Sequence, residues 1–264
     1  FELLPKKPVF NLYQNQSLQM IKKTLPNSLK NFVKKILYKN NNLFSSNSQA
    51  REDVMLKYLF RKYIYQSYKG FYIDIGCQHP IRNNNTYLLY KKGWSGINAD
   101  LDQGNIDLFN SSRPSDHNVS IAVSNKVGEA DLFYFHDKSP INTIDEKTSQ
   151  FQSAKVQSIK KVKTNTLNNI IKSSHYSDMK FDFLSVDVEG HELQVLQGLD
   201  FSKYSPDVIV VEYLDLSVSK LEIKNLNIEN IINSELYKYL TSINYILVNC
   251  IYSDLIFVKK DFRD

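Results

Sequence analysis

Short hydrophobic runs alternate along this chain with segments whose hydrophobic residues recur at helical spacing. The first run, Phe71–Ile75, lies between Gly70 and Gly76 and predicts a strand buried on both faces. Similar runs predict strands at residues 97–99, 118–123, 131–135, 181–186, 208–211, 245–248 and 255–258. Helical spacing predicts helices at residues 86–92, 106–110, within 162–171, at 192–199 and at 228–240. The alternation predicts a parallel α/β sheet, with an antiparallel strand pair at one edge.

The chain before the first strand has a different character. Hydrophobic residues at helical spacing predict a helix over residues 25–38, and the polar segment 40–49 is typical of a linker. A further helix is expected over residues 54–64, with Ser48 as its cap. We therefore divide the chain into an N-terminal basic helical extension with its linker, residues 1–47, and a main domain, residues 48–264.

Residues 136–160 are polar and show no sustained period. They lie between the strands predicted at 131–135 and 181–186. Connections between elements are usually about 4–6 residues long, so this segment is a candidate lid or substrate loop.

Composition is ordinary for a globular protein that buries a core, since 42% of the 264 residues are hydrophobic and 23% are charged. The two cysteines, Cys77 and Cys250, are too far apart to indicate a disulfide framework or metal spacing. No run approaches the roughly 18 apolar residues of a membrane span, and nothing resembles a signal peptide. We therefore expect a cytoplasmic protein.

The net charge of +5 is concentrated in the extension, because residues 1–50 hold eight lysines and one acid. The basic helix at residues 25–39 could pack on the main domain with its lysines in water, or dock at the anionic inner membrane surface. Nucleic acid is not expected as a partner, because no aromatic platform or arginine cluster accompanies the lysines.

Four of the predicted strands end at an acid: Asp74, Asp100, Asp187 and Glu212. The carboxyl ends of parallel strands share one edge, so we expect these carboxylates to converge on a binding crevice. Asp100, which ends the second strand, could accept both hydroxyls of a ribose. The turn at residues 76–80 lacks the repeated glycines that a pyrophosphate needs. A nucleoside without phosphates is therefore favoured over a dinucleotide.

Several motifs occur together and in order: Phe71–Gly76, Asn85–Leu88, Gly93–Asp100, Ile121–Ser124, Leu184–Glu192 and Val210–Glu212. By these motifs the chain resembles the FkbM family of S-adenosylmethionine-dependent methyltransferases, over roughly residues 48–259. The resemblance implies a Rossmann-like class I methyltransferase sheet of seven strands, the last antiparallel, with helices on both faces. The departure lies at residues 77–80, where many relatives have Ala and a second Gly.

The resemblance also implies roles for the matching residues. Asp74, Gly76 and Cys77 would contact the methionine end of S-adenosylmethionine, and Asn85 and Thr86 would contact its carboxylate. Asp100 would hold the ribose. Ala122 and Val123 would flank the adenine. Asp187 would also lie at the cofactor.

The methyl group should lie near the end of strand 181–186, so the candidate catalytic bases are His191, Glu189 and Asp187. The two acids would need desolvation, or could bind a divalent ion together with His191. So short a cluster does not predict a metal site, and the need for a metal stays open. The candidate acceptor contacts are His79, Glu189 and Glu212.

The resemblance implies O-methylation, commonly of a sugar in a surface glycan or of a small natural product. A cytoplasmic enzyme with a lysine-rich helix suits a lipid-linked or nucleotide-linked glycan precursor at the inner membrane face. Two other functions stay open. A non-catalytic nucleoside-binding module would bind the cofactor without turnover, and a nicotinamide-dependent oxidoreductase would be stabilised by NAD.

Overall fold

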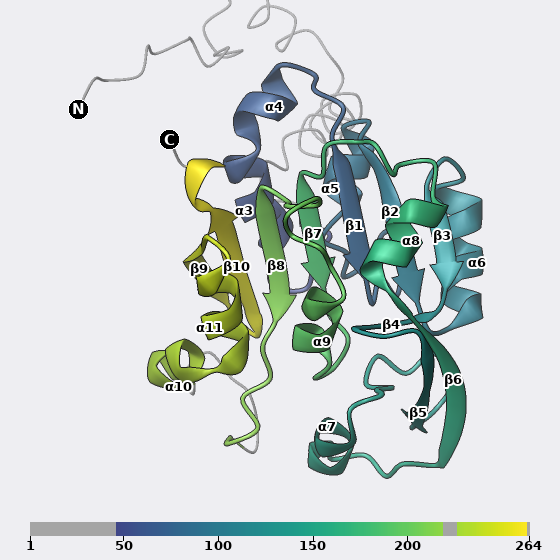
Figure 1. Cartoon of the computed structure of the whole chain (residues 1–264). Coiled ribbons are helices and arrows are strands. Elements are labelled where there is room, and N and C mark those ends of the chain that lie inside the picture. Colours follow the sequence, from purple (N-terminus) through teal and green to yellow (C-terminus); the bar gives the residue numbers. More distant parts are fainter. Residues whose placement is uncertain (1–45, 219–225, 263–264) are drawn as a thin grey trace, which may run out of the picture. The chain divides into compact units, whose positions relative to one another are not determined.

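A single large sheet organises the part of the chain that the computed structural model describes, residues 46–218 and 226–262 (Figure 1). Its strand order is β3-β2-β1-β7-β8-β10-β9. The parallel strands are β3 (His117–Ser120), β2 (Ser95–Asp100), β1 (Phe71–Ile75), β7 (Phe183–Val186) and β8 (Val208–Glu212). The last strand, β10 (Asp254–Lys259), lies between β8 and β9 (Tyr245–Ile251) and is antiparallel to both. The expected seven-stranded sheet with a reversed last strand is confirmed.

Helices cover both faces of this sheet, as expected (Figure 1). Alternate side chains of β1 point to opposite faces. Tyr72 packs with Leu56 of α3 (Glu52–Leu59) and Leu89 of α5 (Tyr87–Lys91). Ile73 belongs to the core of the other face. The helices packed there are α8 (Leu167–Ser173), α9 (Glu192–Gln197), α10 (Ile228–Asn233) and α11 (Glu235–Ser242). The near-continuous hydrophobic run of β1 is therefore explained by burial on both sides.

The single strand predicted at residues 118–123 is wrong. The structure has two strands there, because β3 ends at Ser120 and β4 (Ala122–Ser124) belongs to a second sheet of order β4-β6-β5. Between them, the backbone N–H of Ile121 donates to the carbonyl of Asp100 at 2.9 Å. The chain thus leaves the main sheet at the point where β2 ends.

Two long helices predicted from periodicity are each interrupted. Residues 54–64 fall in α3 and α4 (Arg61–Tyr65), and residues 228–240 fall in α10 and α11. Ser234 causes the second break, because its side chain accepts the N–H of Tyr237 and caps α11. The N-cap position of α3 is Arg51 and not Ser48, although the Ser48 hydroxyl accepts the N–H of Asp53 at 3.1 Å.

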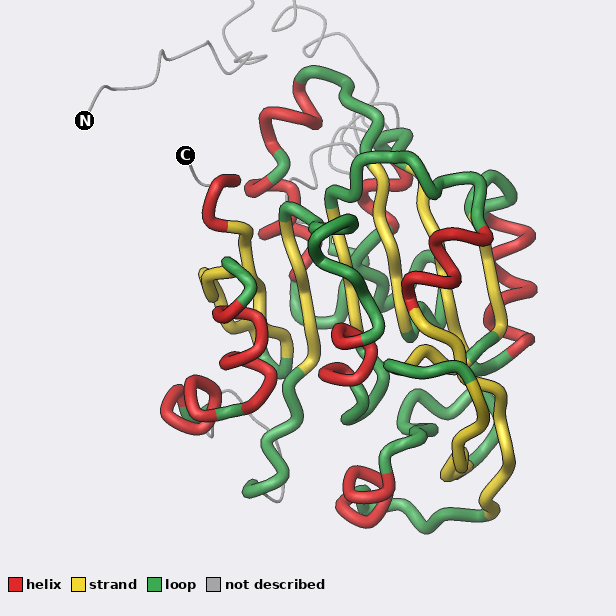
Figure 2. Tube along the Cα trace, in the orientation of Figure 1, coloured by secondary structure: helices red, strands yellow, loops and turns green. Residues whose placement is uncertain are grey.

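Beyond the carboxyl ends of the parallel strands lies a smaller structure, residues 128–166, which we call the cap (Figures 1 and 2). It consists of β5 (Gly128–Tyr134), α7 (Glu146–Phe151) and β6 (Ser158–Thr166), with β5 and β6 antiparallel. The segment predicted as a lid or loop, residues 136–160, makes up its middle. Periodicity missed α7, since six residues hold too few hydrophobic positions to show a repeat.

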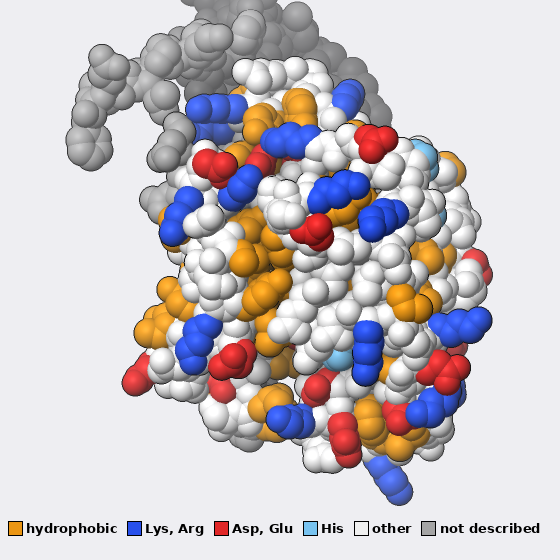
Figure 3. Space-filling model, viewed as in Figure 1, with side chains coloured by type: hydrophobic (Ala, Val, Ile, Leu, Met, Phe, Trp, Pro, Cys, Tyr) orange, Lys and Arg blue, Asp and Glu red, His pale blue; other side chains and the backbone are white. Residues whose placement is uncertain are grey.

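The helix predicted at residues 25–38, and with it residues 1–45 of the proposed extension, lies outside the described residues. Among the helices that are described, none is long and apolar enough to cross a membrane. On the face shown in Figure 3, basic and acidic side chains are intermixed rather than gathered into regions of one sign.

Candidate functional site

A pocket of about 660 Å³ opens at the carboxyl ends of the parallel strands, between the main sheet and the cap. Its sheet side is formed by residues at and just after the ends of β1, β2, β7 and β8, and by the start of α6 (Gln103–Ser112). The cap contributes Leu132, Tyr134, Gln152 and Lys160. Strand ends of different elements thus supply one continuous lining, which is where open α/β sheets place their ligands.

Gly76, directly after β1, lies against the backbone of Asp187, directly after β7. It has φ +77°, a conformation that favours glycine, and a Cβ built on it would lie 1.6 Å from the carbonyl oxygen of Asp187. Its N–H donates to the carbonyl of Ala99 at 2.9 Å. The backbone therefore forms this part of the pocket wall, with no room for a side chain.

Asp100 lies at the end of β2, and backbone groups fix its orientation. Its carboxylate accepts the N–H of Gln78 at 2.9 Å and the N–H of Asp102 at 2.8 Å. The side-chain amide of Asn105 donates to it at 3.2 Å. Burial raises the pKa of Asp100, and these hydrogen bonds oppose that rise. The carboxylate is thus held on the pocket wall before any ligand arrives.

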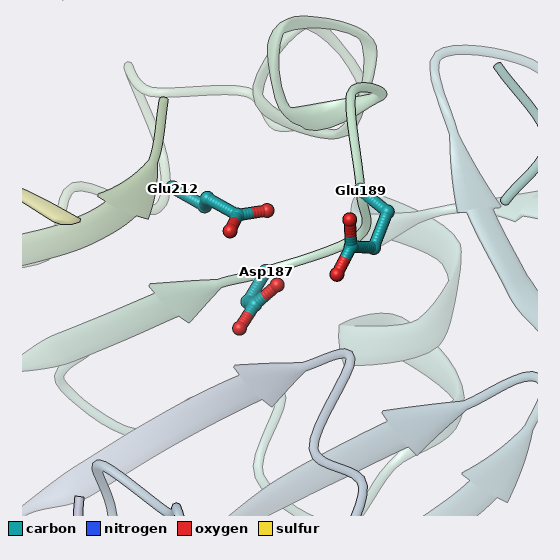
Figure 4. A group of neighbouring side chains, drawn as sticks. All are labelled: Asp187, Glu189 and Glu212. Atoms are coloured by element: carbon teal, nitrogen blue, oxygen red, sulfur yellow. The ribbon is translucent and has the colours of Figure 1, made fainter. Parts of the chain in front are cut away.

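Three acids form what we call the carboxylate cluster: Asp187, Glu189 and Glu212 (Figure 4). One oxygen from each lies within 4.8 Å of the others, and all three residues line the pocket. Burial, followed by repulsion among the acids, raises the pKa of Glu189 to about 8 and that of Glu212 well above its ordinary value. Burial also raises the pKa of Asp187 to about 6.

The loop that carries two of these acids has a fixed backbone. Glu189 and Gly190 have φ values of 57° and 99°. The carboxylate of Glu192, the first residue of α9, accepts the N–H groups of Val188 and Gly190 at 3.1 and 3.0 Å. Burial raises the pKa of Glu192 to about 7. Residues 187–191 are thereby held in a tight turn that directs Glu189 toward the cluster.

The cap contacts the cluster directly. The side-chain amide of Gln152 donates to Glu189 Oε2 at 3.3 Å, and the hydroxyl of Thr143 donates to the carbonyl of Glu189 at 2.7 Å. In the pocket lining, the Lys160 ammonium lies 3.2 Å from the centroid of the Tyr134 ring. The cap therefore fixes the position of Glu189 and adds aromatic and cationic groups to the lining.

Seven of the thirteen residues predicted as site residues line this pocket: Gly76, Asp100, Ala122, Val123, Asp187, Glu189 and Glu212. The residues outside its lining are Asp74, Cys77, His79, Asn85, Thr86 and His191. Three of the four acids expected to converge at one edge therefore do so.

Asp74 lies within β1, one residue before the carboxyl end of the strand. It is paired with Asn98 and Ser185 inside the sheet and is 4% exposed. Its carboxylate accepts the Thr86 hydroxyl at 2.8 Å and the Asn84 amide at 2.9 Å. These bonds hold the loop after β1 in place.

The other residues outside the lining have contacts of their own. The Cys77 side chain is buried against Ile106 and Phe109, under α6. The amide of Asn85 donates to Ser185 Oγ at 3.1 Å. Each of these two side chains therefore packs behind the pocket wall.

Both histidines considered for chemistry have protein partners. Nδ1 of His79 accepts the N–H groups of Ile81 and Arg82, in a turn after β1. Nε2 of His191 is 2.9 Å from the Ser124 hydroxyl, and the residue occupies the N-cap position of α9. Burial lowers the pKa of His191, which favours the neutral ring.

Sequence reasoning missed Arg113, a fully buried side chain that supports the loop after β1. Its guanidinium donates to Asn84 Oδ1 and Thr86 Oγ1, each at 2.8 Å, and to the carbonyl of Pro80. The start of α6 was missed as well. Asp102 caps that helix, and the sequence Asp102-Gln103-Gly104 could have shown it.

A family model provides the decisive comparison, since the methyltransferase FkbM domain matches residues 74–240. The chain belongs to this family. The match runs from within β1 to within α11 and includes all three acids of the carboxylate cluster.

Two solved structures match this chain at low identity. A chain described as monomeric WbdD has 12% sequence identity and a TM-score of 0.40, with 82% of this chain and 42% of that chain covered. A methyltransferase FkbM from Methylobacillus flagellatus KT has 11% identity and a TM-score of 0.43, with 80% of this chain and 56% of that chain covered. This chain thus spans about half the length of the two solved structures. No curated protein matches it.

Proposed function

We propose that this FkbM-family protein is an S-adenosylmethionine-dependent O-methyltransferase that acts on a hydroxyl of a sugar. The acceptor would be a surface glycan or its lipid-linked or nucleotide-linked precursor. The observation that carries the proposal is the pocket wall made by Gly76, Asp100 and the carboxylate cluster, at the carboxyl edge of a sheet with a reversed last strand.

The residues present fit S-adenosylmethionine. Sites for ligands of this size are usually about 300–1,000 Å³, and this pocket of about 660 Å³ lies in that range. Asp100 is suited to the ribose hydroxyls, while Ala122 and Val123 offer apolar walls for the adenine. The backbone at Gly76 would allow the methionine part to approach closely.

Bound S-adenosylmethionine would supply a methyl group on a sulfonium. The protein must hold the acceptor hydroxyl in line with that group, and alignment alone can contribute about 7–11 kcal/mol. A general base typically adds about 10²–10⁴-fold. Glu189, whose pKa is raised to about 8, faces the pocket and is suited to take the hydroxyl proton. His191, the other candidate base, is paired through Nε2 with Ser124 and lies outside the pocket lining, so we assign it no proton transfer.

The first experiment compares thermal stabilisation by S-adenosylhomocysteine and by NAD. A ligand at about 100 times its Kd adds about 2.7 kcal/mol to the free energy of unfolding, so stabilisation by S-adenosylhomocysteine alone is expected. Asp100→Asn should weaken that effect. Asp107→Asn, at an exposed position of the following helix α6 and outside the pocket lining, is the matched control and should not. Stabilisation by NAD alone would refute the proposal in favour of an oxidoreductase.

The second experiment measures transfer of labelled methyl groups to sugar acceptors. Cofactor binding without turnover on any hydroxylated acceptor would support a nucleoside-binding module instead. Transfer to small natural products, but not to nucleotide-linked or lipid-linked sugars, would show that the acceptor is a small natural product and not a glycan precursor.

We also propose that residues 25–39 make a peripheral contact with anionic membranes, which would bring the enzyme to a glycan precursor at the inner membrane surface. The support is the lysine pattern of that segment. The test is flotation of the full chain with anionic liposomes, compared with a variant in which Lys30, Lys34 and Lys35 are changed to Ser. Equal flotation of the two proteins would refute the contact.

A further inference from the structure

We propose that the carboxylate cluster of Asp187, Glu189 and Glu212 is a binding site for a hard divalent cation such as Mg²⁺ or Mn²⁺. The inference rests on the proposed function, since the ion would face the pocket in which the acceptor hydroxyl is expected.

The geometry of the three side chains suits one ion. Asp187 follows β7, Glu189 lies two residues further in the tight turn, and Glu212 ends the neighbouring strand β8. Their carboxyl groups point toward one another (Figure 4). One oxygen of each lies within 4.8 Å of the others. Oxygens bound to Mg²⁺ or Ca²⁺ lie about 2.0–2.6 Å from the ion, so ligands on opposite sides are about 4–5 Å apart. Small side-chain adjustments therefore complete the site.

Glu212 gives an observation independent of the clustering. It is 8% exposed, and its Oε2 has no hydrogen-bond partner although it is buried. Buried polar atoms are rarely left unpaired, because an unmade bond costs about 1–3 kcal/mol. The Glu212 carboxylate points toward Asp187 and Glu189 (Figure 4). An ion between the three groups would satisfy this oxygen.

The absence of nearby basic groups in the described residues also favours a bound cation. In residues 46–218 and 226–262, no Lys, Arg or His nitrogen lies within 4.0 Å of the three carboxylates. Buried charges are normally paired or bound to metals. An all-oxygen ligand set with three carboxylates favours Mg²⁺, Mn²⁺ or Ca²⁺ over zinc or copper. The side of the cluster that faces the pocket leaves coordination positions for water and for an acceptor hydroxyl.

The ligand set differs from the one considered from the sequence. His191 was the third candidate beside Asp187 and Glu189, but its ring is paired with Ser124 and it is not in the cluster. Glu212 takes that place. The sequence predicted Glu212 as an acidic strand end at the same edge and as an acceptor contact, but not as a metal ligand.

The test uses the full chain after treatment with a chelator. Calorimetric titration with Mg²⁺, and with Mn²⁺ followed by electron paramagnetic resonance, should show one saturable site. Glu212→Gln, which keeps the side-chain shape and removes one ligand charge, should weaken binding by about 10²-fold or more, and Glu189→Gln, at a partly buried position, should do the same. Asp254→Asn is the matched control. It removes a neighbouring carboxylate outside the cluster and should change the affinity by less than about tenfold.

No saturable binding by the unaltered chain at millimolar Mg²⁺ and Mn²⁺ would overturn the site, as would equal binding by Glu189→Gln. Titration of the metal-free protein with S-adenosylhomocysteine separates this result from the proposed function. Binding of S-adenosylhomocysteine without a metal site refutes only the metal inference, and a metal site without S-adenosylhomocysteine binding refutes only the methyl-transfer proposal.

Discussion

Replacing Arg113 with Met should destabilise the protein more than most single substitutions. The guanidinium is fully buried and makes no ion pair within 4.0 Å in the described part of the chain. It donates instead to four neutral oxygens: those of Pro80, Asn84, Thr86 and Tyr72. Arg113→Met therefore removes the donor of hydrogen bonds to buried oxygens in and around the loop after β1.

The magnitude follows from those acceptors. Each buried group left without its partner costs about 1–3 kcal/mol. Asn84 and Thr86 keep other hydrogen bonds, whereas the Pro80 carbonyl has no other partner given by the structure. Met retains much of the apolar volume and avoids the cost of burying a charge. A net loss of about 1–3 kcal/mol in the free energy of unfolding is expected, set mainly by the Pro80 carbonyl left without a donor.

Urea unfolding followed by circular dichroism measures this loss. Arg113→Lys should recover little, because one ammonium cannot reach acceptors spread around a planar guanidinium. Arg82→Met, an exposed arginine in the same loop, is the control and should change stability by less than about 0.5 kcal/mol. A loss below about 1 kcal/mol for Arg113→Met would refute the assigned role.

Three other changes test separate parts of the structure. Gly76→Ala should cost more than about 2 kcal/mol and abolish S-adenosylhomocysteine binding, because its Cβ meets the Asp187 carbonyl in a backbone conformation unfavourable for Ala. In the metal-free protein, the pKa of the Glu189 carboxyl is raised to about 8, above its value in the unfolded chain. The stability that its protonated form contributes is therefore lost as the pH rises through 8, and the unfolding temperature should fall between pH 6 and pH 9. Glu189→Gln, which does not titrate, should flatten that fall. Lys180→Met should cost about 1–2 kcal/mol in urea, since its ammonium lies 3.0 Å from buried Asp182, with the cost reduced by the exposure of the lysine.

Each of these has a control and an opposing result. Gly104→Ala has its nearest contact at 3.0 Å, with a side-chain oxygen, and should be tolerated; equal loss in both glycine variants would contradict the close-approach argument. An unfolding temperature that rises toward pH 9 would contradict the pH prediction. Lys161→Met removes an exposed ion pair and should leave stability unchanged, so equal effects at Lys161 and Lys180 would contradict the role of burial.

The sequence identified the main sheet because its strands are buried hydrophobic runs with acids at their ends. Asp100, Asp187 and Glu212 could be placed at one edge from strand order alone. The interruption between β3 and β4 at Ile121 could not be predicted, because it depends on a hydrogen bond to Asp100 and on pairing of β4 with β6, far along the chain. Strand β6 begins earlier than expected, since its first half is exposed and rich in lysine.

Side-chain direction explains most differences at the site. Asp74 and Cys77 lie close to Gly76 in sequence, but their side chains face away from the pocket. Asp74 accepts a hydrogen bond from Thr86, and Cys77 packs under α6. Arg113 gave no signal, because a basic residue at a helix end is usually a solvent-exposed partner of the helix dipole. Its burial among acceptors from the loop after β1 is decided by tertiary structure.

The position of β10 has a consequence for how the protein is made. Residues 254–259 separate β8 from β9, so an emerging polypeptide presents the exposed edge of β8 until those residues leave the ribosome. β9 is synthesised before β10 and has no strand to pair with in the meantime. Pulling-force or protease measurements on stalled ribosomes should therefore find that the half of the sheet carrying Glu212 acquires its native form only after the rest of the core.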